Sequence, residues 1–210
     1  DIAFKQCTVT NLSDQILTNP CSEFVNIPYA SCNLGSINLN HCVVEGDTAN
    51  AYFDWNEFER LTRRATRFLN NVIDANEFPL EKIREVTKQV RPIGLGAMGY
   101  AHMLYRLGIP YNSKEADAFC ADIFEALTLI AMDESCNIAK ETGETYPAYD
   151  FDLFMKANER FNLEGTELYD KIKQYGLANS CFTSIAPNGS IGYIADMTTG
   201  GIEPVFALTY

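Results

Sequence analysis

Asn19-Pro20-Cys21-Ser22-Glu23 places an amide, a thiol and a carboxylate at alternate positions, and Pro20 biases how they point. A proline resists a helix through the segment and pushes the preceding residue toward extended backbone. In an extended chain, residues i, i+2 and i+4 share a side. We therefore expect Asn19, Cys21 and Glu23 to face one small substrate together.

The chemistry open to this segment is narrow. A thiol beside a hydrogen-bonding amide and a base suits either thiolate attack or one-electron chemistry at sulfur. Thiolate enzymes normally need a histidine partner, and His41 and His102, the two histidines of the chain, lie in no recognisable setting. A structural interpretation also stands, in which Cys21 is a small hydrophobic residue buried in a turn. Spacing alone leaves both interpretations open.

A second run, residues 31–39 (SCNLGSINL), follows closely and places Cys32 eleven positions after Cys21. Three later segments continue the pattern in order: residues 91–99 (RPIGLGAMG), 184–191 (SIAPNGSI) and 201–210 (GIEPVFALTY). Together these motifs closely resemble the catalytic subunit of ribonucleotide reductase, which makes deoxyribonucleotides from ribonucleotides. The resemblance covers nearly all of residues 18–210, and several motifs in register are far more specific than any one of them.

The resemblance implies roles for four residues. Cys21 matches the cysteine that becomes a thiyl radical and takes the 3′ hydrogen of the ribose, and Glu23 matches the carboxylate that removes the 3′ hydroxyl proton. Asn19 matches the amide that hydrogen-bonds the ribose hydroxyls. Cys32 matches one of two cysteines that reduce the substrate radical and end as a disulfide. Its partner lies well upstream in the family, so Cys7 is not assigned that role.

Residues 181–191 allow two structures. Asn188 and Gly189 between apolar runs are typical of a type I′ hairpin. Alternatively, residues 181–186 form a buried strand, and the N–H groups of Gly189, Ser190 and Ile191 then open a short helix that cradles a diphosphate without a lysine. The resemblance favours this phosphate loop. The residues assigned to substrate binding are Ser22, Ala186, Pro187, Asn188, Gly189, Ser190 and Ile191.

Two substrate-binding positions depart from the closest relatives of the resembled family. Ser22 stands where those relatives usually have glycine, and Asn188 where they usually have threonine. Both are small polar replacements that remove no group used in bond making. We expect them to affect fine positioning more than activity.

Residues 94–99 (GLGAMG) fit the GxGxxG dinucleotide fingerprint letter for letter. That fingerprint needs a preceding hydrophobic strand and an acidic residue about 20 positions further on, after a second strand. Here a charged, helix-like segment precedes the glycines, and Glu115 and Asp117 fall inside a predicted helix. We interpret the glycines as sites of close backbone packing at a helix start.

The periodicity predicts an α/β chain. Short strands are expected at residues 24–27 and 36–44, and helices at 55–78, 83–90 and 113–142, with a less regular helical stretch at 152–175 broken near Gly165. The resemblance implies that residues 1–210 form a single domain, a fragment of the ten-stranded α/β barrel of the ribonucleotide reductase and glycyl radical enzyme type. Composition and periodicity do not themselves predict a barrel.

Charge and cysteine usage restrict the class of protein. A net charge of −12 disfavours binding to DNA or RNA backbones. No apolar run approaches the roughly 18 residues of a membrane helix, and no signal peptide opens the chain. Seven cysteines at irregular spacings, without a CxxC pair, favour neither a disulfide scaffold nor a zinc site. We expect a cytoplasmic redox protein without a bound metal or a membrane partner.

A thiyl radical needs a generator. The Asn-Pro-Cys form of the first motif and residues 31–39 look most like the adenosylcobalamin-dependent class, and the runner-up is the class served by a separate metal-containing radical subunit. The other partners implied are a ribonucleotide, a thioredoxin- or glutaredoxin-type reductant and the remainder of the catalytic chain, and a homodimer is compatible with the family. The alternative function is an inert or nucleotide-binding fragment.

Overall fold

The computed structural model describes residues 7–13, 16–195 and 199–206. Its strands are β1 (Leu17–Thr18), β2 (Val25–Asn26), β3 (Asn33–Asn38), β4 (Val43–Val44), β5 (Tyr52–Phe53) and β6 (Ile93–Met98). Its α-helices are α2 (Trp55–Ala75), α3 (Glu81–Val90), α4 (Tyr100–Leu107), α5 (Lys114–Thr142), α6 (Phe151–Ala157), α7 (Glu167–Tyr175) and α8 (Gly189–Ile194). Two 3₁₀ helices, η1 (Leu39–Cys42) and η2 (Glu159–Phe161), complete the list. The α/β class is confirmed.

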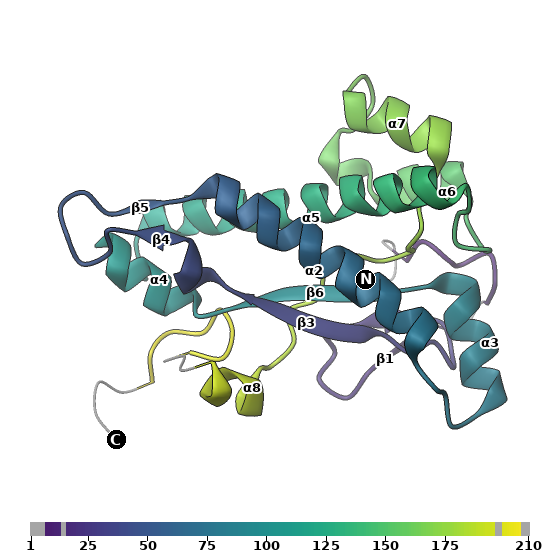
Figure 1. Cartoon of the computed structure of the whole chain (residues 1–210), viewed down its shortest axis with the longest axis horizontal. Helices are drawn as coiled ribbons and strands as arrows, with labels where there is room; N and C mark the ends of the chain where they lie inside the picture. Colours follow the sequence, from purple (N-terminus) through teal and green to yellow (C-terminus); the bar gives the residue numbers. More distant parts are fainter. Residues whose placement is uncertain (1–6, 14–15, 196–198, 207–210) are drawn as a thin grey trace.

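The long strands β3 and β6 form a parallel pair at the centre of the molecule (Figure 1). Asn33 pairs with Ile93 and the register continues to Asn38 and Met98. A parallel pair requires a long crossover, which α2 and α3 provide. Thr183 extends the sheet by one parallel bridge to Leu95. The described strands form three separate two-stranded sheets, β1–β2, β3–β6 and β4–β5, and they do not close a barrel in this part of the chain.

The segment around Thr183 is extended, as expected, but it is not a regular strand. The N–H groups of Ile93 and Leu95, two residues apart in β6, donate to the carbonyls of Cys181 and Phe182, which are adjacent. Ser184 then donates its N–H to Leu95. This uneven pairing breaks the ladder after a single bridge.

The glycine-rich segment at residues 94–99 differs from its predicted structure. Gly94 and Gly96 lie inside the fully buried strand β6, whereas close packing at a helix start was expected. Only Gly99, with φ of 73°, begins a helix, as the N-cap of α4. The first two glycines thus lie within the strand and not in the turn between strand and helix, where a dinucleotide-binding fingerprint needs them.

The two longest helices begin where the sequence predicts, and α5 also ends there, whereas α2 ends at Ala75 and not at residue 78. Asp54 caps α2 by accepting from the N–H groups of Asn56 and Glu57. Ser113 caps α5, and Gly143, with φ of 73°, ends it. These are the residue types that helix caps favour.

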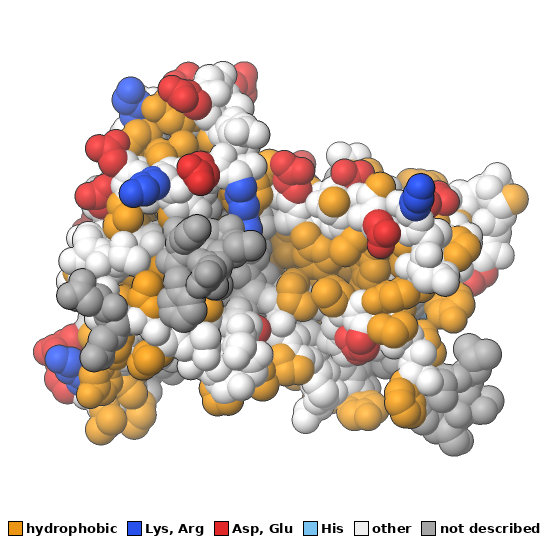
Figure 2. Space-filling model, turned by 180° about the vertical axis from the view of Figure 1, so that it is seen from behind, with side chains coloured by type: hydrophobic (Ala, Val, Ile, Leu, Met, Phe, Trp, Pro, Cys, Tyr) orange, Lys and Arg blue, Asp and Glu red, His pale blue; other side chains and the backbone are white. Residues whose placement is uncertain are grey.

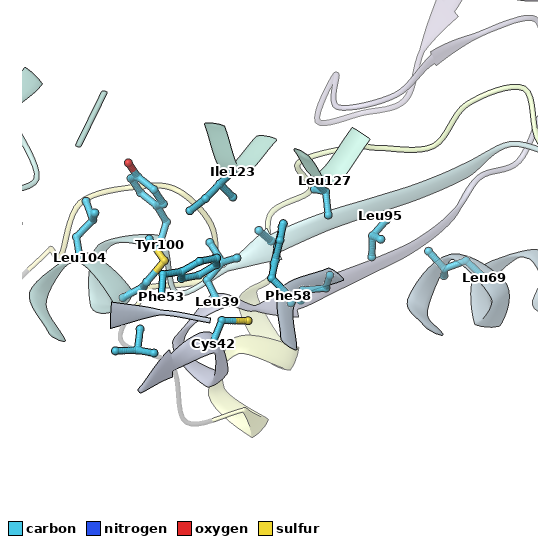
Figure 3. Close-up of a cluster of buried hydrophobic side chains, with 14 of the residues drawn as sticks. Leu39, Cys42, Phe53, Phe58, Leu69, Leu95, Tyr100, Leu104, Ile123 and Leu127 are labelled. Atoms are coloured by element: carbon cyan, nitrogen blue, oxygen red, sulfur yellow. The ribbon is translucent and has the colours of Figure 1, made fainter. Parts of the chain in front are cut away.

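Helices α2 and α5 lie together on one side of β3 and β6, while α8 lies on the other side (Figure 1). Their apolar side chains meet the strands in the main core, where Phe58, Leu95 and Leu127 are buried (Figure 3). A fully buried side chain of this size contributes about 1.5–3 kcal/mol. This layer fixes β6 from the helix side and leaves its opposite side for the site.

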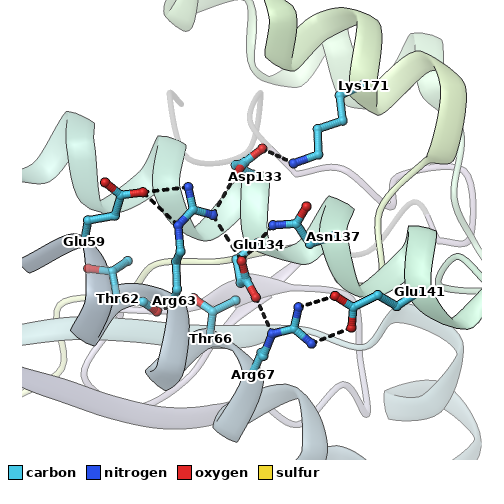
Figure 4. A network of polar contacts seen from close by, with 10 residues as sticks. All are labelled: Glu59, Thr62, Arg63, Thr66, Arg67, Asp133, Glu134, Asn137, Glu141 and Lys171. Atoms are coloured by element: carbon cyan, nitrogen blue, oxygen red, sulfur yellow. Dashed lines mark hydrogen bonds and ion pairs between the residues drawn. The ribbon is translucent and has the colours of Figure 1, made fainter. Parts of the chain in front are cut away.

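An ionic network joins α2 to α5 and α7 (Figure 4). Arg63 contacts Asp133 at 2.6 Å and Glu134 at 3.1 Å, and Arg67 contacts the same buried Glu134. Lys171 of α7 also contacts Asp133. Although burial opposes it, the hydrogen bonds from Lys171 and Arg63 lower the pKa of Asp133. The network therefore holds Asp133 as the carboxylate partner of two cations.

The opposite face of the molecule carries a broad band of hydrophobic side chains with few charges between them (Figure 2). Among the described residues, the most exposed large apolar side chains are Phe206, Tyr193 and Ile194. In the described part of the chain, no helix combines the length and apolar character needed to cross a bilayer.

Candidate active site

The cysteine loop, residues 19–24, is the tip of a hairpin between β1 and β2. Asn19 and Phe24 close it, because the Asn19 N–H donates to the Phe24 carbonyl at 3.2 Å and the Phe24 N–H donates to Asn19 Oδ1 at 3.1 Å. A tight turn lies inside, where the Ser22 N–H donates to the Asn19 carbonyl at 3.0 Å. Ser22 takes φ of 62°.

The expected extended alternation of Asn19, Cys21 and Glu23 is therefore wrong. Pro20 occupies the second position of a turn, where its fixed φ is favourable, and the asparagine side chain bonds backbone nearby. Asn19 thus uses Oδ1 inside the loop. The turn leaves Cys21 exposed at the loop tip, with a free thiol.

Glu23 sits where the loop meets the sheet. Its backbone carbonyl accepts from Ser184 Oγ at 2.6 Å, which joins the loop to the extended segment beside β6. Its carboxylate atom Oε2 is buried and has no hydrogen-bond partner among the described residues. An unpartnered buried carboxylate oxygen costs about 1–3 kcal/mol. Its lone pairs are therefore not used by the described part of the protein.

Cys32 lies half-buried immediately before β3. Burial raises the pKa of its thiol well above the usual range, and the nearby Cys181 thiol and Glu23 carboxylate raise it further. The thiol therefore stays protonated at neutral pH. A protonated thiol suits hydrogen donation better than nucleophilic attack.

Two glycines of β6 make room for these groups. A Cβ atom on Gly94 would lie 3.1 Å from Cys32 Sγ and 2.6 Å from a methyl carbon of Leu34. A Cβ on Gly96 would lie 2.4 Å from the Ser184 carbonyl oxygen. We call this surface, formed by Cys32, Gly94, Gly96 and Ser184, the site face of the sheet. It requires glycine at both positions.

The phosphate loop, residues 186–191, opens the short helix α8 and does not form the hairpin that its Asn-Gly pair suggests. Ala186 and Asn188 are buried, whereas Pro187, Gly189 and Ser190 are exposed. A Cβ on Gly189 would meet nothing within 4 Å. The protein therefore leaves open space beside the Gly189 backbone, on the side where a Cβ atom would lie.

The predicted site residues do not all line one hollow. Asn19 and Cys32 line one cavity of about 480 Å³. Glu23 lines another, of about 560 Å³, together with Thr183 and Ser184. Asn188 and Gly189 line a third, of about 480 Å³. Site-face residues line the first two of these cavities, and Asn188, the hydrogen-bond partner of Ser36, lines the third, but the exposed Cys21 lines none of them.

Sequence analysis missed three residues of this arrangement. Ser184 and Ser36 bond the two loops to the sheet, and Cys181 lies beside Cys32. The one available signal is that Ser184 and Ser36 fall inside the quoted motifs. Within the described residues, no group of three or more histidine, cysteine, aspartate or glutamate side chains is placed to hold a metal ion.

Comparison with known proteins gives the context of this site. Residues 5–210 match the family model described as ribonucleotide reductase, barrel domain. The vitamin B12-dependent ribonucleoside-diphosphate reductase of Thermoplasma acidophilum is 41% identical over 96% of this chain and 23% of its own length. The protein of the same name from Mycobacterium tuberculosis is 37% identical over 92% of this chain and 24% of its own length.

A relative without B12 in its name is also similar. The ribonucleoside-diphosphate reductase large subunit of Caenorhabditis elegans is 30% identical over 100% of this chain and 28% of its own length. The chain thus spans about a quarter of the curated relatives that it matches. With a family model covering residues 5–210, the chain belongs to the ribonucleotide reductase barrel-domain family.

Proposed function

We propose that this chain carries the radical active site of a ribonucleotide reductase and takes part in reducing ribonucleotides at C2′. The observation that carries the proposal is the arrangement at the site face. The cysteine loop exposes Cys21 and carries a buried, unpartnered Glu23 oxygen, and the protonated Cys32 thiol lies near the Glu23 carboxylate. The similarity to named reductases supports the same conclusion.

In the proposed mechanism, Cys21 acts as the thiyl radical that takes the 3′ hydrogen of the ribose. Glu23 Oε2 accepts the proton of the 3′ hydroxyl, for which an oxygen without another partner is suited. Asn19 hydrogen-bonds the ribose hydroxyls through Nδ2, because its Oδ1 is used inside the loop. Cys32 and an upstream cysteine supply two electrons and two protons and end as a disulfide. One proton leaves with the 2′ hydroxyl as water and the other ends as the new hydrogen on C2′. Glu23 then returns its proton to the 3′ oxygen, and Cys21 returns the hydrogen atom to C3′, which restores the thiyl radical.

The phosphate loop is proposed to hold the substrate phosphates through the N–H groups of Gly189, Ser190 and Ile191, with Ala186, Pro187 and Asn188 shaping the turn. Ser22 is proposed to border the substrate at the cysteine loop. The protein has an excess of acidic residues, so a backbone site is a suitable device for an anion. Its open surroundings at Gly189 support this role.

The radical source is proposed to be adenosylcobalamin, because two of the relatives are named as B12-dependent. When bound, this group supplies the one-electron chemistry that generates the thiyl radical. An exposed thiol at a loop tip fits a generator that approaches from outside the sheet. The alternative is a radical from a separate metal-containing subunit, which the same exposure would also serve.

The remaining proposals concern context. We propose that residues 1–210 belong to one domain, work with the remainder of a catalytic chain, and are recycled by a thioredoxin- or glutaredoxin-type reductant in the cytoplasm. All seven cysteines are free thiols, which suits a reducing compartment. A homodimer and the choice between di- and triphosphate substrates belong to the same proposal.

Deoxyribonucleotide formation by the full-length protein tests the function. We expect Cys21→Ser to abolish reduction while circular dichroism stays unchanged, because an alcohol O–H is too strong to serve as the radical relay. Cys120→Ser, which changes a half-buried thiol outside the site, is the matched control and should stay active. An active Cys21→Ser would refute the assignment. Nucleotide binding without turnover by the wild type would favour the binding-module alternative.

A further inference from the structure

Asn188 makes three hydrogen bonds with a side chain that is only 6% exposed. Its Oδ1 accepts from Ser36 Oγ at 2.8 Å. Its Nδ2 donates to the Ala186 carbonyl at 3.0 Å and to the Gly200 carbonyl at 2.6 Å. We call this set of contacts the Asn188 bridge. It joins the phosphate loop to strand β3 and to the segment that follows α8.

This use of the side chain is unusual for the position. Asn188 is the N-cap of α8, where asparagine commonly accepts from the first N–H groups of the helix. Here it makes no such bond. Its backbone carbonyl accepts from Gly192 at 2.9 Å, while the amide turns back into the protein. The side chain therefore fixes where the loop lies and does not cap the helix.

The Ser36 contact is informative because of where Ser36 lies. Residues 32, 34 and 36 share one side of the extended chain, and the contacts of Gly94 and Gly96 place Cys32 and Ser36 on the site face. The hydrogen bond from Ser36 to Asn188 thus fixes the position of the phosphate loop relative to β3, the strand that follows Cys32.

We propose that Asn188 is a positioning residue of the phosphate loop. Through the Asn188 bridge it keeps the loop, and so the substrate phosphates that the loop binds, at a fixed distance from the thiol of Cys32. This inference rests on the proposed function. A threonine could not replace the bridge, because one hydroxyl has a single donor and cannot serve both carbonyls. The asparagine therefore does more than substitute for a small polar residue.

The test compares Asn188→Asp, Asn188→Ala and Ser36→Ala in the full-length reductase. Aspartate keeps the acceptor for Ser36 but turns an anionic oxygen toward two carbonyls. Asn50→Asp, an exposed residue outside the site, adds the same charge and is the control. The readouts are the KM of reduction and the binding of nucleoside and nucleotide by calorimetry.

We expect Asn188→Asp to raise the KM for the nucleotide about tenfold or more at pH 8, and Ser36→Ala to raise it about fivefold, the scale of one lost hydrogen bond. Nucleoside affinity should change little. The defect of Asn188→Asp should shrink as the pH falls, because a buried carboxyl facing carbonyl oxygens has a raised pKa and donates once protonated. A merely structural defect would lower the affinity for nucleoside and nucleotide alike. The Ser36→Ala/Asn188→Ala double variant should be no worse than Asn188→Ala.

An unchanged nucleotide KM in a folded Asn188→Asp, or a defect that is constant with pH, would overturn the inference. If Asn188→Asp does not fold, Ser36→Ala decides, and an unchanged KM in that variant has the same consequence. Failure of the proposed function gives a different result. In that case the wild-type protein itself forms no deoxyribonucleotide, whatever the Asn188 variants do.

Discussion

Gly96→Ala tests the link between packing and chemistry most directly. The added Cβ would lie 2.4 Å from the carbonyl oxygen of Ser184 and 3.3 Å from Ser36 Oγ. Carbon and oxygen atoms do not approach to 2.4 Å without a bond, so the Ser184 backbone must retreat by at least about half an ångström. Ser184 holds the backbone of Glu23 at 2.6 Å, so the cysteine loop must move with it.

Two magnitudes follow from this geometry. Overpacking of a buried strand should lower the free energy of unfolding by about 1–3 kcal/mol. A displacement approaching 1 Å at a catalytic group can cost about 10²-fold in rate. We therefore expect kcat to fall about 10- to 100-fold in a protein that remains folded.

The assay measures kcat for ribonucleotide reduction together with urea unfolding of the same preparation. Gly35→Ala is the matched control, because Gly35 lies on the neighbouring strand β3 and its added Cβ would meet Leu69 at 3.4 Å, an ordinary contact. It should keep nearly full activity. The reasoning fails if Gly96→Ala retains kcat within about twofold of wild type, well inside the expected loss.

Three further outcomes are expected. Glu23→Gln should lower kcat by about 10²- to 10⁴-fold with little change in affinity, and a loss below about fivefold would place the base elsewhere. Cys32→Ser should allow at most one abortive turnover, because the dithiol that reduces the substrate is then incomplete. Mass spectrometry of the wild-type protein after turnover should find Cys32 in a disulfide with an upstream cysteine. A disulfide between Cys32 and Cys7 would contradict the assignment. Asp133→Asn should lower the free energy of unfolding at pH 7. Because the pKa of Asp133 is lowered in the fold, this stabilisation is present above the ordinary aspartate pKa and is lost as the pH falls through the folded value, so the difference should vanish in acid.

Local signals predicted the helices well. Ser113 and Gly143 mark both ends of α5, because caps depend on residues next to each other in the chain. Strand β6 was missed, because its glycines have low strand propensity and its partner β3 lies about 60 residues earlier. Its glycines are explained only by the atoms of Leu34, Cys32 and Ser184 that approach them.

The candidate site shows the same limit. The alternation around Pro20 predicted an extended segment, but the side chain of Asn19 satisfies the Phe24 N–H and closes a hairpin. The Asn188-Gly189 pair is by itself typical of a hairpin, and only the resemblance favoured the helix start that forms, in which the asparagine amide contacts Ser36 and Gly200. In both places a polar side chain found a partner that the local pattern does not reveal.

Two hydroxyl contacts fix the two loops of the site to the two chain segments that flank β6, namely β3 and the segment around Thr183. Ser184 holds the cysteine loop at Glu23, and Ser36 holds the phosphate loop at Asn188. Gly96 lies between them, since its missing side chain would meet both serines. A substrate bound at its phosphates and attacked at its ribose needs both loops in a fixed relation. Both serines lie against the space left by the missing side chain of Gly96, so the backbone of β6 sets the position of each loop relative to the other. One methyl group added at Gly96 should therefore displace the loop at the phosphates and the loop at the ribose at once.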